Sequence, residues 1–140
     1  MNPNQTAVYP YLAFNGNCRE AMTFYKDCIG GELEIMDFAS APMDTPPEAK
    51  NNVMHSRLTK GELTIMASDS MPGQPVTNGS SVALSVNCTS KEEVDTYFNN
   101  LSKDGNVTMP AAETFWGAYF GMLTDKFGIH WMFNYDKPQQ

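Results

Sequence analysis

The strongest folding signal in this chain of 140 residues lies near its C-terminus, in the consecutive segments FWGAYFGML (115–123), TDKFG (124–128) and IHWMFNY (129–135). Two apolar, aromatic-rich segments flank a short turn that contains Asp and Gly, and this pattern predicts a β-hairpin. In the last segment, large apolar residues alternate with other residues. Because successive side chains of a strand point to opposite sides, these two sets of residues lie on opposite faces of the strand. One face is expected to pack in the core. The other face, which carries His130 and Met132, is expected to line a pocket.

A second hairpin is predicted around the turn Lys60-Gly61. This turn would pair Leu58 with Leu63, and the same reasoning pairs Leu123 with Ile129 in the C-terminal hairpin. The more apolar face of each hairpin is expected to receive a helix. The mixed face is expected to line the concave side of the sheet, together with residues of the first strand of each half: Tyr9, Tyr11, His55, Arg57, Met66, Ser81, Ser85, Phe120, Met122, His130 and Met132.

The chain repeats one arrangement of elements. A predicted strand precedes each of two amphipathic helices, and each helix begins with a capping pattern, Asn17 with Glu20 and Ser90 with Glu93. The agreement of strand, cap and apolar face indicates an internal duplication. Each half then continues with three strands, which gives a βαβββ unit. The predicted organisation is a first module at 1–70, a linker at 71–80 and a second module at 81–140.

Two features of the chain outside the hairpins complete this interpretation. The first strand of each half is expected at 9–14 and at 81–86. Residues 40–52 contain Pro42, Pro46 and Pro47, so they are expected to form a loop, long enough to act as a lid.

Charge and cysteine content limit the classes of partner. The chain has 9 Lys and Arg against 16 Asp and Glu, a formal net charge of −7, and no two basic residues are adjacent. A protein that binds phosphate backbones or anionic membranes needs clustered cations, so neither partner is expected. There is no signal-peptide pattern and no apolar run near the ~18 residues of a spanning helix. Cys18, Cys28 and Cys88 lack zinc-type spacing. Cys18 and Cys28 are expected on one helix, about 15 Å apart at ~1.5 Å per residue and too far for a disulfide, so a reduced, cytoplasmic protein is the simplest expectation.

The repeated βαβββ unit resembles the vicinal oxygen chelate superfamily, which includes glyoxalases, bleomycin-resistance proteins and dioxygenases. Within it, the chain is similar to PhnB-like proteins, often labelled demethylubiquinone-methyltransferase-like. The likeness rests on PYLAFNG (10–16), MASD (66–69) and the segment from Trp116 to Phe133. It implies an α+β fold in which two βαβββ modules form a curved eight-stranded sheet with helices on the outside. It also implies a homodimer.

Enzymes of this superfamily place metal ligands on the first and last strands of the two halves. Aligned by strand, these positions in this chain are Tyr9, Met66, Ser81 and Met132. None is a histidine or a carboxylate, whereas hard divalent ions prefer oxygen and imidazole ligands. No cofactor and no divalent metal are therefore predicted, although thioethers with a histidine would suit a soft ion such as Cu(I).

The remaining candidates have alternative interpretations. His55 and His130 are either half-buried histidines bonded to their surroundings or general acid–base groups. Arg57 either binds a ligand carboxylate or phosphate or is a solvated strand residue. Asp69 either serves the site or caps the linker turn. The aromatic residues on these strands are either core or ligand-binding side chains: Tyr9, Tyr11, Trp116 and Phe120.

Two functions remain open. The first is metal-free binding of a small, partly aromatic or anionic molecule in the concave cavity. The second is an isomerase, lyase or dioxygenase of the superfamily with an atypical metal site that uses His55 or His130. A methyltransferase would need a glycine-rich loop between a strand and a helix, whereas Gly30-Gly31 follows the predicted helix.

Overall fold

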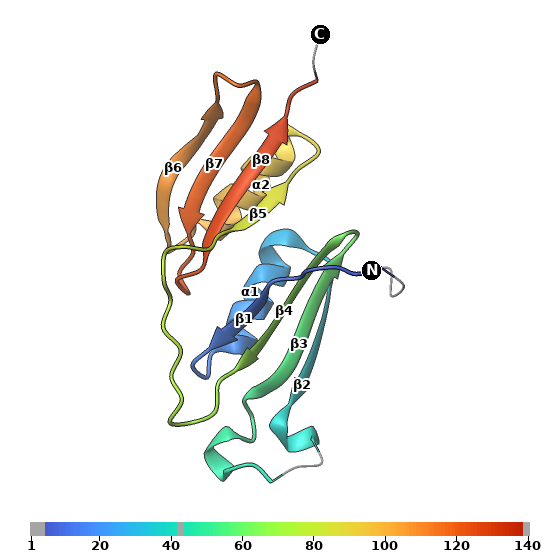
Figure 1. Cartoon of the computed structure of the whole chain (residues 1–140), viewed down its shortest axis with the longest axis vertical. Coiled ribbons are helices and arrows are strands. Elements are labelled where there is room, and N and C mark those ends of the chain that lie inside the picture. The colour runs from blue at the N-terminus through green and yellow to red at the C-terminus, as the bar shows by residue number, and fades with distance from the viewer. Residues whose placement is uncertain (1–4, 42–43, 139–140) are drawn as a thin grey trace. The chain divides into compact units, whose positions relative to one another are not determined.

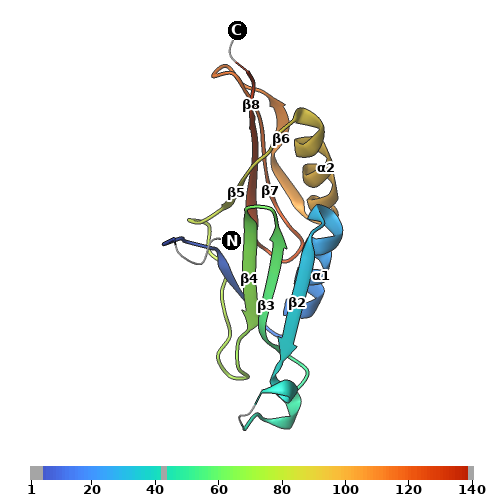
Figure 2. The same ribbon diagram turned by 90° about the vertical axis from the view of Figure 1, so that its right-hand side faces the viewer.

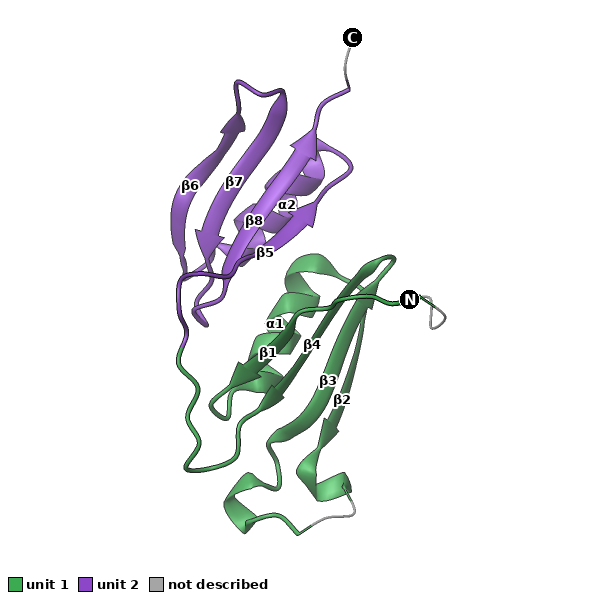
Figure 3. Cartoon of the chain, viewed as in Figure 1, with its two compact units in different colours: residues 1–77 green, residues 78–140 purple. Residues whose placement is uncertain are grey.

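A computed structural model of the chain describes residues 5–41 and 44–138. The chain divides into two compact units, residues 1–77 and residues 78–140 (Figures 1 and 3). Each unit contains one helix and one four-stranded sheet. No helix among the described residues is both long enough and apolar enough to span a bilayer.

The first unit is a βαβββ module. Its sheet has the order β1-β4-β3-β2, in which β1 runs parallel to β4 and the other neighbours are antiparallel. Two short 3-10 turns, η1 and η2, lie between β2 and β3. The elements are β1 (Tyr11–Phe14), α1 (Cys18–Ile29), β2 (Glu32–Asp37), η1 (Phe38–Ser40), η2 (Pro47–Ala49), β3 (Val53–Lys60) and β4 (Leu63–Asp69).

The second unit repeats this topology. Its sheet has the order β5-β8-β7-β6, and β5 runs parallel to β8. The repeated βαβββ unit and the α+β class predicted from the sequence are therefore confirmed. The elements are β5 (Leu84–Asn87), α2 (Lys91–Leu101), β6 (Asn106–Glu113), β7 (Ala118–Thr124) and β8 (His130–Asp136).

In both hairpins the side chains lie on the predicted faces of the sheet, but the residues that pair across the strands differ from the predicted ones. Leu58 lies opposite Ile65, and Leu123 lies opposite Trp131, so each register is shifted by two residues from the expected one. A shift of two keeps every side chain on its face, because the side-chain period of a strand is two. The C-terminal turn is wider than expected since buried Asp125 organises it and accepts hydrogen bonds from the backbone N–H groups of Phe127 and Ile129.

In the first unit, α1 covers one face of the sheet (Figure 2). Leu58, Ile65 and Ala67 are buried on this face, and the Ser56 hydroxyl lies 3.6 Å from the Cys18 thiol of the helix. Alternate residues of β3 and β4 therefore point to the opposite side. We call the side of each sheet that its own helix does not cover the helix-free face.

In the second unit, α2 packs on β7 and β8 (Figure 2). Phe98 of the helix makes an edge-to-face contact with Phe133, whose ring stacks on Trp131. Gly121 allows this packing, because a Cβ atom there would lie 2.7 Å from the Phe98 ring. The alternate residues of β7 and β8 lie on the helix-free face.

The two helices begin differently. Ser90 caps α2 as predicted, since its hydroxyl accepts the backbone N–H of Glu93 at 3.0 Å. Asn17 occupies the N-cap position of α1 as predicted, but its side chain makes no capping bond. Asp69 of β4 takes that role, with Oδ1 2.9 Å from the backbone nitrogens of Gly16 and Cys18. The hypothesis that Asp69 caps the linker turn is likewise corrected.

Three expected boundaries also change. Strand β1 begins at Tyr11 and β5 at Leu84, so the first strands are shorter than predicted. The expected lid loop begins at the last residue of η1 and contains η2, and backbone bonds from Phe38 to Asn52 and from Ala39 to Lys50 close its base. Pro42 lies outside the described residues.

Candidate functional site

A row of four side chains crosses the helix-free face of the first unit. Strand register places Tyr11 beside Met66, Met66 beside Arg57, and Arg57 beside Glu34. Neighbouring strands lie ~4.8 Å apart, so the row joins a phenol, a thioether, a guanidinium and a carboxylate over a short distance. Three of the residues predicted to bind ligand are thus brought together.

His55 lies on the same face, two residues before Arg57. Its Nδ1 is 3.3 Å from the Tyr11 hydroxyl, and the two rings are 5.9 Å apart. The Tyr11 side chain is 50% exposed, so this pair is open to a ligand. Sequence reasoning identified both residues as candidates but did not predict their contact, because it depends on the register between β1, β4 and β3.

Arg57 has an unusual environment. Its Nε is buried and has no hydrogen-bond partner among the described residues. A buried donor without an acceptor costs free energy, and most buried polar groups in folded proteins are paired. The Nε of Arg57 is therefore shielded from solvent, although the residue as a whole is intermediate in exposure.

Three methionines cross the helix-free face of the second unit. Met109 of β6 lies beside Met122 of β7, and Met122 lies opposite Met132 of β8. Sequence reasoning placed Met122 and Met132 on this face but missed Met109. Its strand has no clear alternation of apolar and polar residues, so no two-residue period pointed to it.

An aromatic pair extends the same face. Phe120 lies two residues before Met122 on β7, and its ring makes an edge-to-face contact with Trp116 at 6.2 Å. The Trp116 side chain is 57% exposed. The turn that carries it is fixed by the Thr114 hydroxyl, which donates to the carbonyl of Ala118 and accepts the backbone N–H of the same residue.

His130 is held at both ring nitrogens. Nε2 lies 2.8 Å from the carbonyl oxygen of Gly79, and Nδ1 lies 2.8 Å from the Thr124 hydroxyl. A carbonyl oxygen can only accept, so Nε2 carries the proton, and in the neutral ring Nδ1 accepts from Thr124. This arrangement matches the interpretation of a histidine bonded to its surroundings.

The four positions that align with the metal-ligand positions of superfamily enzymes differ in where they lie in the structure. Met66 and Met132 lie on central strands, next to Tyr11 and Ser85 respectively. Tyr9 and Ser81 precede the strands on which they were expected. Among the described residues, no group of three or more His, Cys, Asp or Glu side chains is arranged to hold a metal ion. Thioethers at Met66 and Met132 are poor ligands for hard ions.

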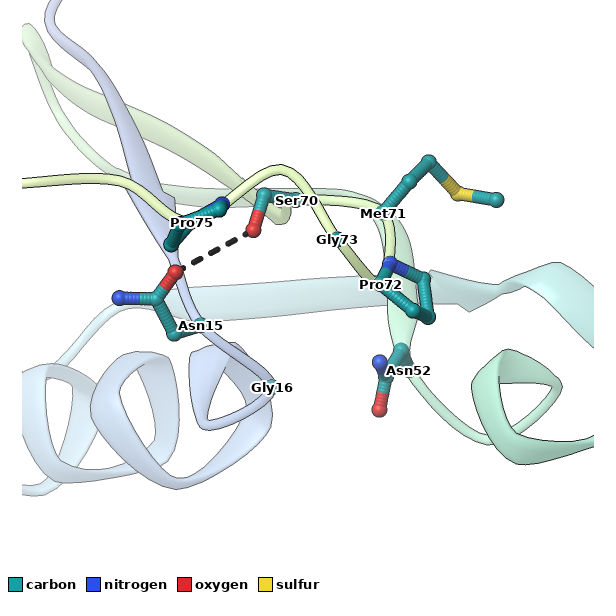
Figure 4. A pocket seen from close by; sticks show the side chains of 8 residues that line it. All are labelled: Asn15, Gly16, Asn52, Ser70, Met71, Pro72, Gly73 and Pro75. Atoms are coloured by element: carbon teal, nitrogen blue, oxygen red, sulfur yellow. Dashed lines mark hydrogen bonds between the residues drawn. The ribbon is translucent and has the colours of Figure 1, made fainter.

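A pocket of about 470 Å³ lies elsewhere in the first unit, where β1 leads into α1 (Figure 4). Asn15 organises its rim by bonding both the N–H and the carbonyl of Val76 and by accepting from the Ser70 hydroxyl. None of its described lining residues is charged, and most of them belong to the predicted linker or directly precede it. The lining residues are Asn15, Gly16, Asn52, Ser70, Met71, Pro72, Gly73 and Pro75.

The thiols of Cys18 and Cys88 are poor nucleophiles. All three cysteines of the chain are buried. Burial raises the pKa of Cys18 to about 11, and burial together with the nearby Glu93 carboxylate raises the pKa of Cys88 to about 12. Since the thiolate is the reactive form, neither side chain is set up for nucleophilic catalysis.

Comparison with known proteins identifies the family. The sequence profile of the 3-demethylubiquinone-9 3-methyltransferase family matches residues 6–133. The chain belongs to this family. It is 34% identical to protein YjdN of Escherichia coli (strain K12) over 141 residues, which cover 93% of this chain and 95% of that protein.

Two solved structures are similar to this chain over almost their whole length, and one of them is a PhnB protein. Protein PA1353 from Pseudomonas aeruginosa is 42% identical, with a TM-score of 0.87 over 96% of this chain and 100% of that chain. A PhnB protein from Bacillus cereus is 30% identical, with a TM-score of 0.75 over 93% of this chain and 99% of that chain.

The fold of this PhnB-like chain is the glyoxalase/bleomycin resistance fold. Solved structures of glyoxalase/bleomycin resistance proteins at 15–17% identity have TM-scores from 0.60 to 0.64, a likeness that shows the fold alone. Gly30 and Gly31 lie between α1 and β2, so they follow a helix and do not lead from a strand into one. A Cβ atom at Gly31 would collide with the carbonyl oxygen of Thr59, so this glycine permits close packing of the backbone.

Proposed function

We propose that this PhnB-like protein binds a small, partly aromatic or anionic molecule on the helix-free faces of its sheets, without a metal ion. The observation that carries this proposal is the continuous row of Met109, Met122 and Met132, on a face where Phe120 contacts the half-exposed ring of Trp116. Methionine sulfur makes favourable contacts with aromatic rings, and its flexible side chain adapts to ligands of different shape.

The chemistry of the two faces supports an organic ligand. Pockets gain affinity from apolar area and orientation from a few polar groups. The second unit offers thioethers and rings, whereas the first unit offers the Tyr11–His55 pair and Arg57. The face of the first unit, taken by itself, combines the Met66 thioether and the Tyr11 ring with Arg57, a set that suits a planar molecule with one polar or anionic end.

The test uses the two tryptophans of the chain. Trp116 is 57% exposed and Trp131 is 1% exposed, so a ligand on the helix-free face of the second unit should change the emission of Trp116 and leave Trp131 unchanged. A library of planar aromatic compounds would be screened by thermal shift on chelator-treated protein, and hits would be titrated by fluorescence.

Matched variants decide whether the methionine row takes part. Met122→Gln should weaken binding of the hits, whereas Val82→Ala should not, because Val82 is 74% exposed and precedes the strands of the sheet. Trp116→Phe should remove the fluorescence response. Equal binding by Met122→Gln and by the parent, or the absence of any hit, would contradict the proposal.

A second candidate is an enzyme of the superfamily type with an atypical metal site at His55. It has one supporting observation: His55 makes a single hydrogen bond, to Tyr11, among the described residues, whereas both nitrogens of His130 are used. Isomerase, lyase and dioxygenase assays with added divalent ions would test it. Turnover that requires the ion and is lost in His55→Ala would favour this function over binding alone.

A further inference from the structure

The two arginines of the chain have different environments. The Arg19 guanidinium donates to the carbonyl oxygen of Asn51 and lies 3.9 Å from the Asp37 carboxylate. Arg57 has a buried Nε without a hydrogen-bond partner among residues 5–41 and 44–138. In a chain with 16 acidic residues against 9 basic ones, an arginine whose buried Nε has no acceptor requires an explanation.

The neighbours of Arg57 do not supply that acceptor. Met66 offers only a thioether sulfur, which is a weak acceptor. Glu34 lies opposite on the edge strand β2, is exposed, and forms no ion pair with Arg57 in the described part of the chain. The strands therefore place Arg57 on the helix-free face, where its Nε–H donor is buried and has no acceptor among the described residues.

We propose that Arg57 anchors the carboxylate of an aromatic acid, a statement that deepens the proposed binding function and rests on it. The Nε–H and the adjacent Nη–H lie on one edge of the planar guanidinium, and they match the two oxygens of a carboxylate. Binding thus supplies the acceptor that the folded chain does not provide. The residue determines specificity for the charged end of the ligand.

The distance from Arg57 to Tyr11 across the sheet limits the size of the ligand. Tyr11 lies two strands from Arg57, which is about 10 Å between their backbones. A carboxylate on Arg57 therefore places an attached ring system over Met66, with its far edge toward the Tyr11–His55 pair. One or two fused rings fill this distance.

The binding test compares 2-naphthoate with its neutral isostere 2-naphthamide, by calorimetry on the full chain. The parent should bind the acid more tightly than the amide. Arg57→Gln should weaken binding of the acid by about tenfold or more, as expected for a lost hydrogen bond to a charged group, and leave the amide unchanged. Arg57→Lys keeps the charge but lacks the paired donors, so it should restore binding only in part. Arg19→Gln is the matched control and should change neither affinity.

The outcomes separate this inference from the proposed function. Equal affinity for acid and amide, unaffected by Arg57→Gln, would overturn the carboxylate anchor and leave small-molecule binding intact. No binding of either probe, with no hit in the wider screen, would overturn both. Inorganic phosphate is the third probe: if it displaces the acid and binds more tightly, the anchor serves phosphate, and the carboxylate assignment is wrong.

A measurement without ligand provides an independent check. If the unpartnered donor of Arg57 serves binding, its removal should not harm the fold. Arg57→Met, which keeps an unbranched apolar stem, should therefore melt at the temperature of the parent or above it. A clear fall in melting temperature would show that Arg57 supports the fold and would overturn the inference.

Discussion

The carboxylate of Asp69, the last residue of β4, caps helix α1 through a hydrogen bond of 2.9 Å from the backbone N–H of Cys18. The same oxygen accepts from Gly16, and Oδ2 accepts the backbone N–H of Val53 at 2.8 Å. One buried side chain thus joins the start of the helix and the start of β3 to the end of β4.

Replacing Asp69 should therefore cost more than the loss of an ordinary cap. Asp69→Ala removes the cap and leaves three backbone N–H groups without their acceptor, so we expect a loss of about 2–4 kcal/mol in the free energy of unfolding. Ser90→Ala should cost about 1 kcal/mol, as a typical cap does. Asn17→Ala should change stability by less than about 0.5 kcal/mol, because its side chain makes no capping bond. Urea unfolding of the three variants measures these values, and a larger loss for Asn17→Ala than for Asp69→Ala would contradict the assignment.

Replacing one or the other of the two tryptophans should lower the free energy of unfolding by very different amounts. Trp131 is 1% exposed, stacks on Phe133 and donates its Nε1–H to Asp125 Oδ2 at 2.8 Å. Trp131→Ala should cost about 3–5 kcal/mol, as large-to-small changes in a core do. Trp116→Ala should cost less than about 1 kcal/mol, since its ring is more than half exposed. Comparable losses in the free energy of unfolding for the two variants, measured by denaturant unfolding, would show that Trp116 is a core residue.

Alkaline pH should destabilise the fold through the buried thiols. Folding raises the pKa of Cys18 from 9.0 to about 11 and that of Cys88 from 9.0 to about 12. The unfolded chain therefore loses these protons first as the pH rises. The contribution to stability is full below pH 9, and it is lost as the pH rises through about 11 for Cys18 and about 12 for Cys88.

Unfolding measured between pH 8 and pH 11 checks this dependence. The Cys18→Ala, Cys88→Ala double variant should show a smaller fall in stability over this range than the parent. In native protein at pH 8, both thiols should react slowly with a disulfide reagent, whereas the denatured chain should react at once. Fast reaction of the native thiols would show that these groups are not protected by burial.

Protein purified without chelator should contain no stoichiometric zinc, iron, manganese or nickel. The reason is the donor set: Met66 and Met132 offer thioethers, which hard divalent ions disfavour. Elemental analysis gives the answer directly. About one divalent ion per chain, lost in His55→Ala or His130→Ala, would support the enzyme function instead. Uptake of Cu(I) alone would be consistent with the thioether groups of Met66 and Met132.

The chain should form a homodimer in solution. Several large apolar side chains of the second unit are exposed, including Met109 at 44% and Phe115 at 97%. Burying such surface stabilises association, and two-fold dimers are the commonest assemblies. Sedimentation at tens of micromolar (about the concentration of the binding assays) should show two chains. A strict monomer would contradict the expectation.

The sequence alone was sufficient for the fold class and for the faces of the strands. Alternation in the two hairpins placed Leu58, Trp131 and Phe133 in the core and Arg57 and Met132 on the opposite side, and the structure agrees. The cap at Ser90 was likewise readable, because a capping box is formed by residues three positions apart. These features depend on local periodicity, which a single sequence records.

Only the tertiary structure decided which residues meet. Asp69 caps a helix that begins 51 positions earlier in the chain, and His55 reaches Tyr11 across 44 positions. The register of each hairpin differed by two residues from the simplest turn, since the period of a strand fixes the face but not the partner. The free Nε–H donor of Arg57 was also invisible in the sequence, because whether a donor finds an acceptor depends on every element packed around it.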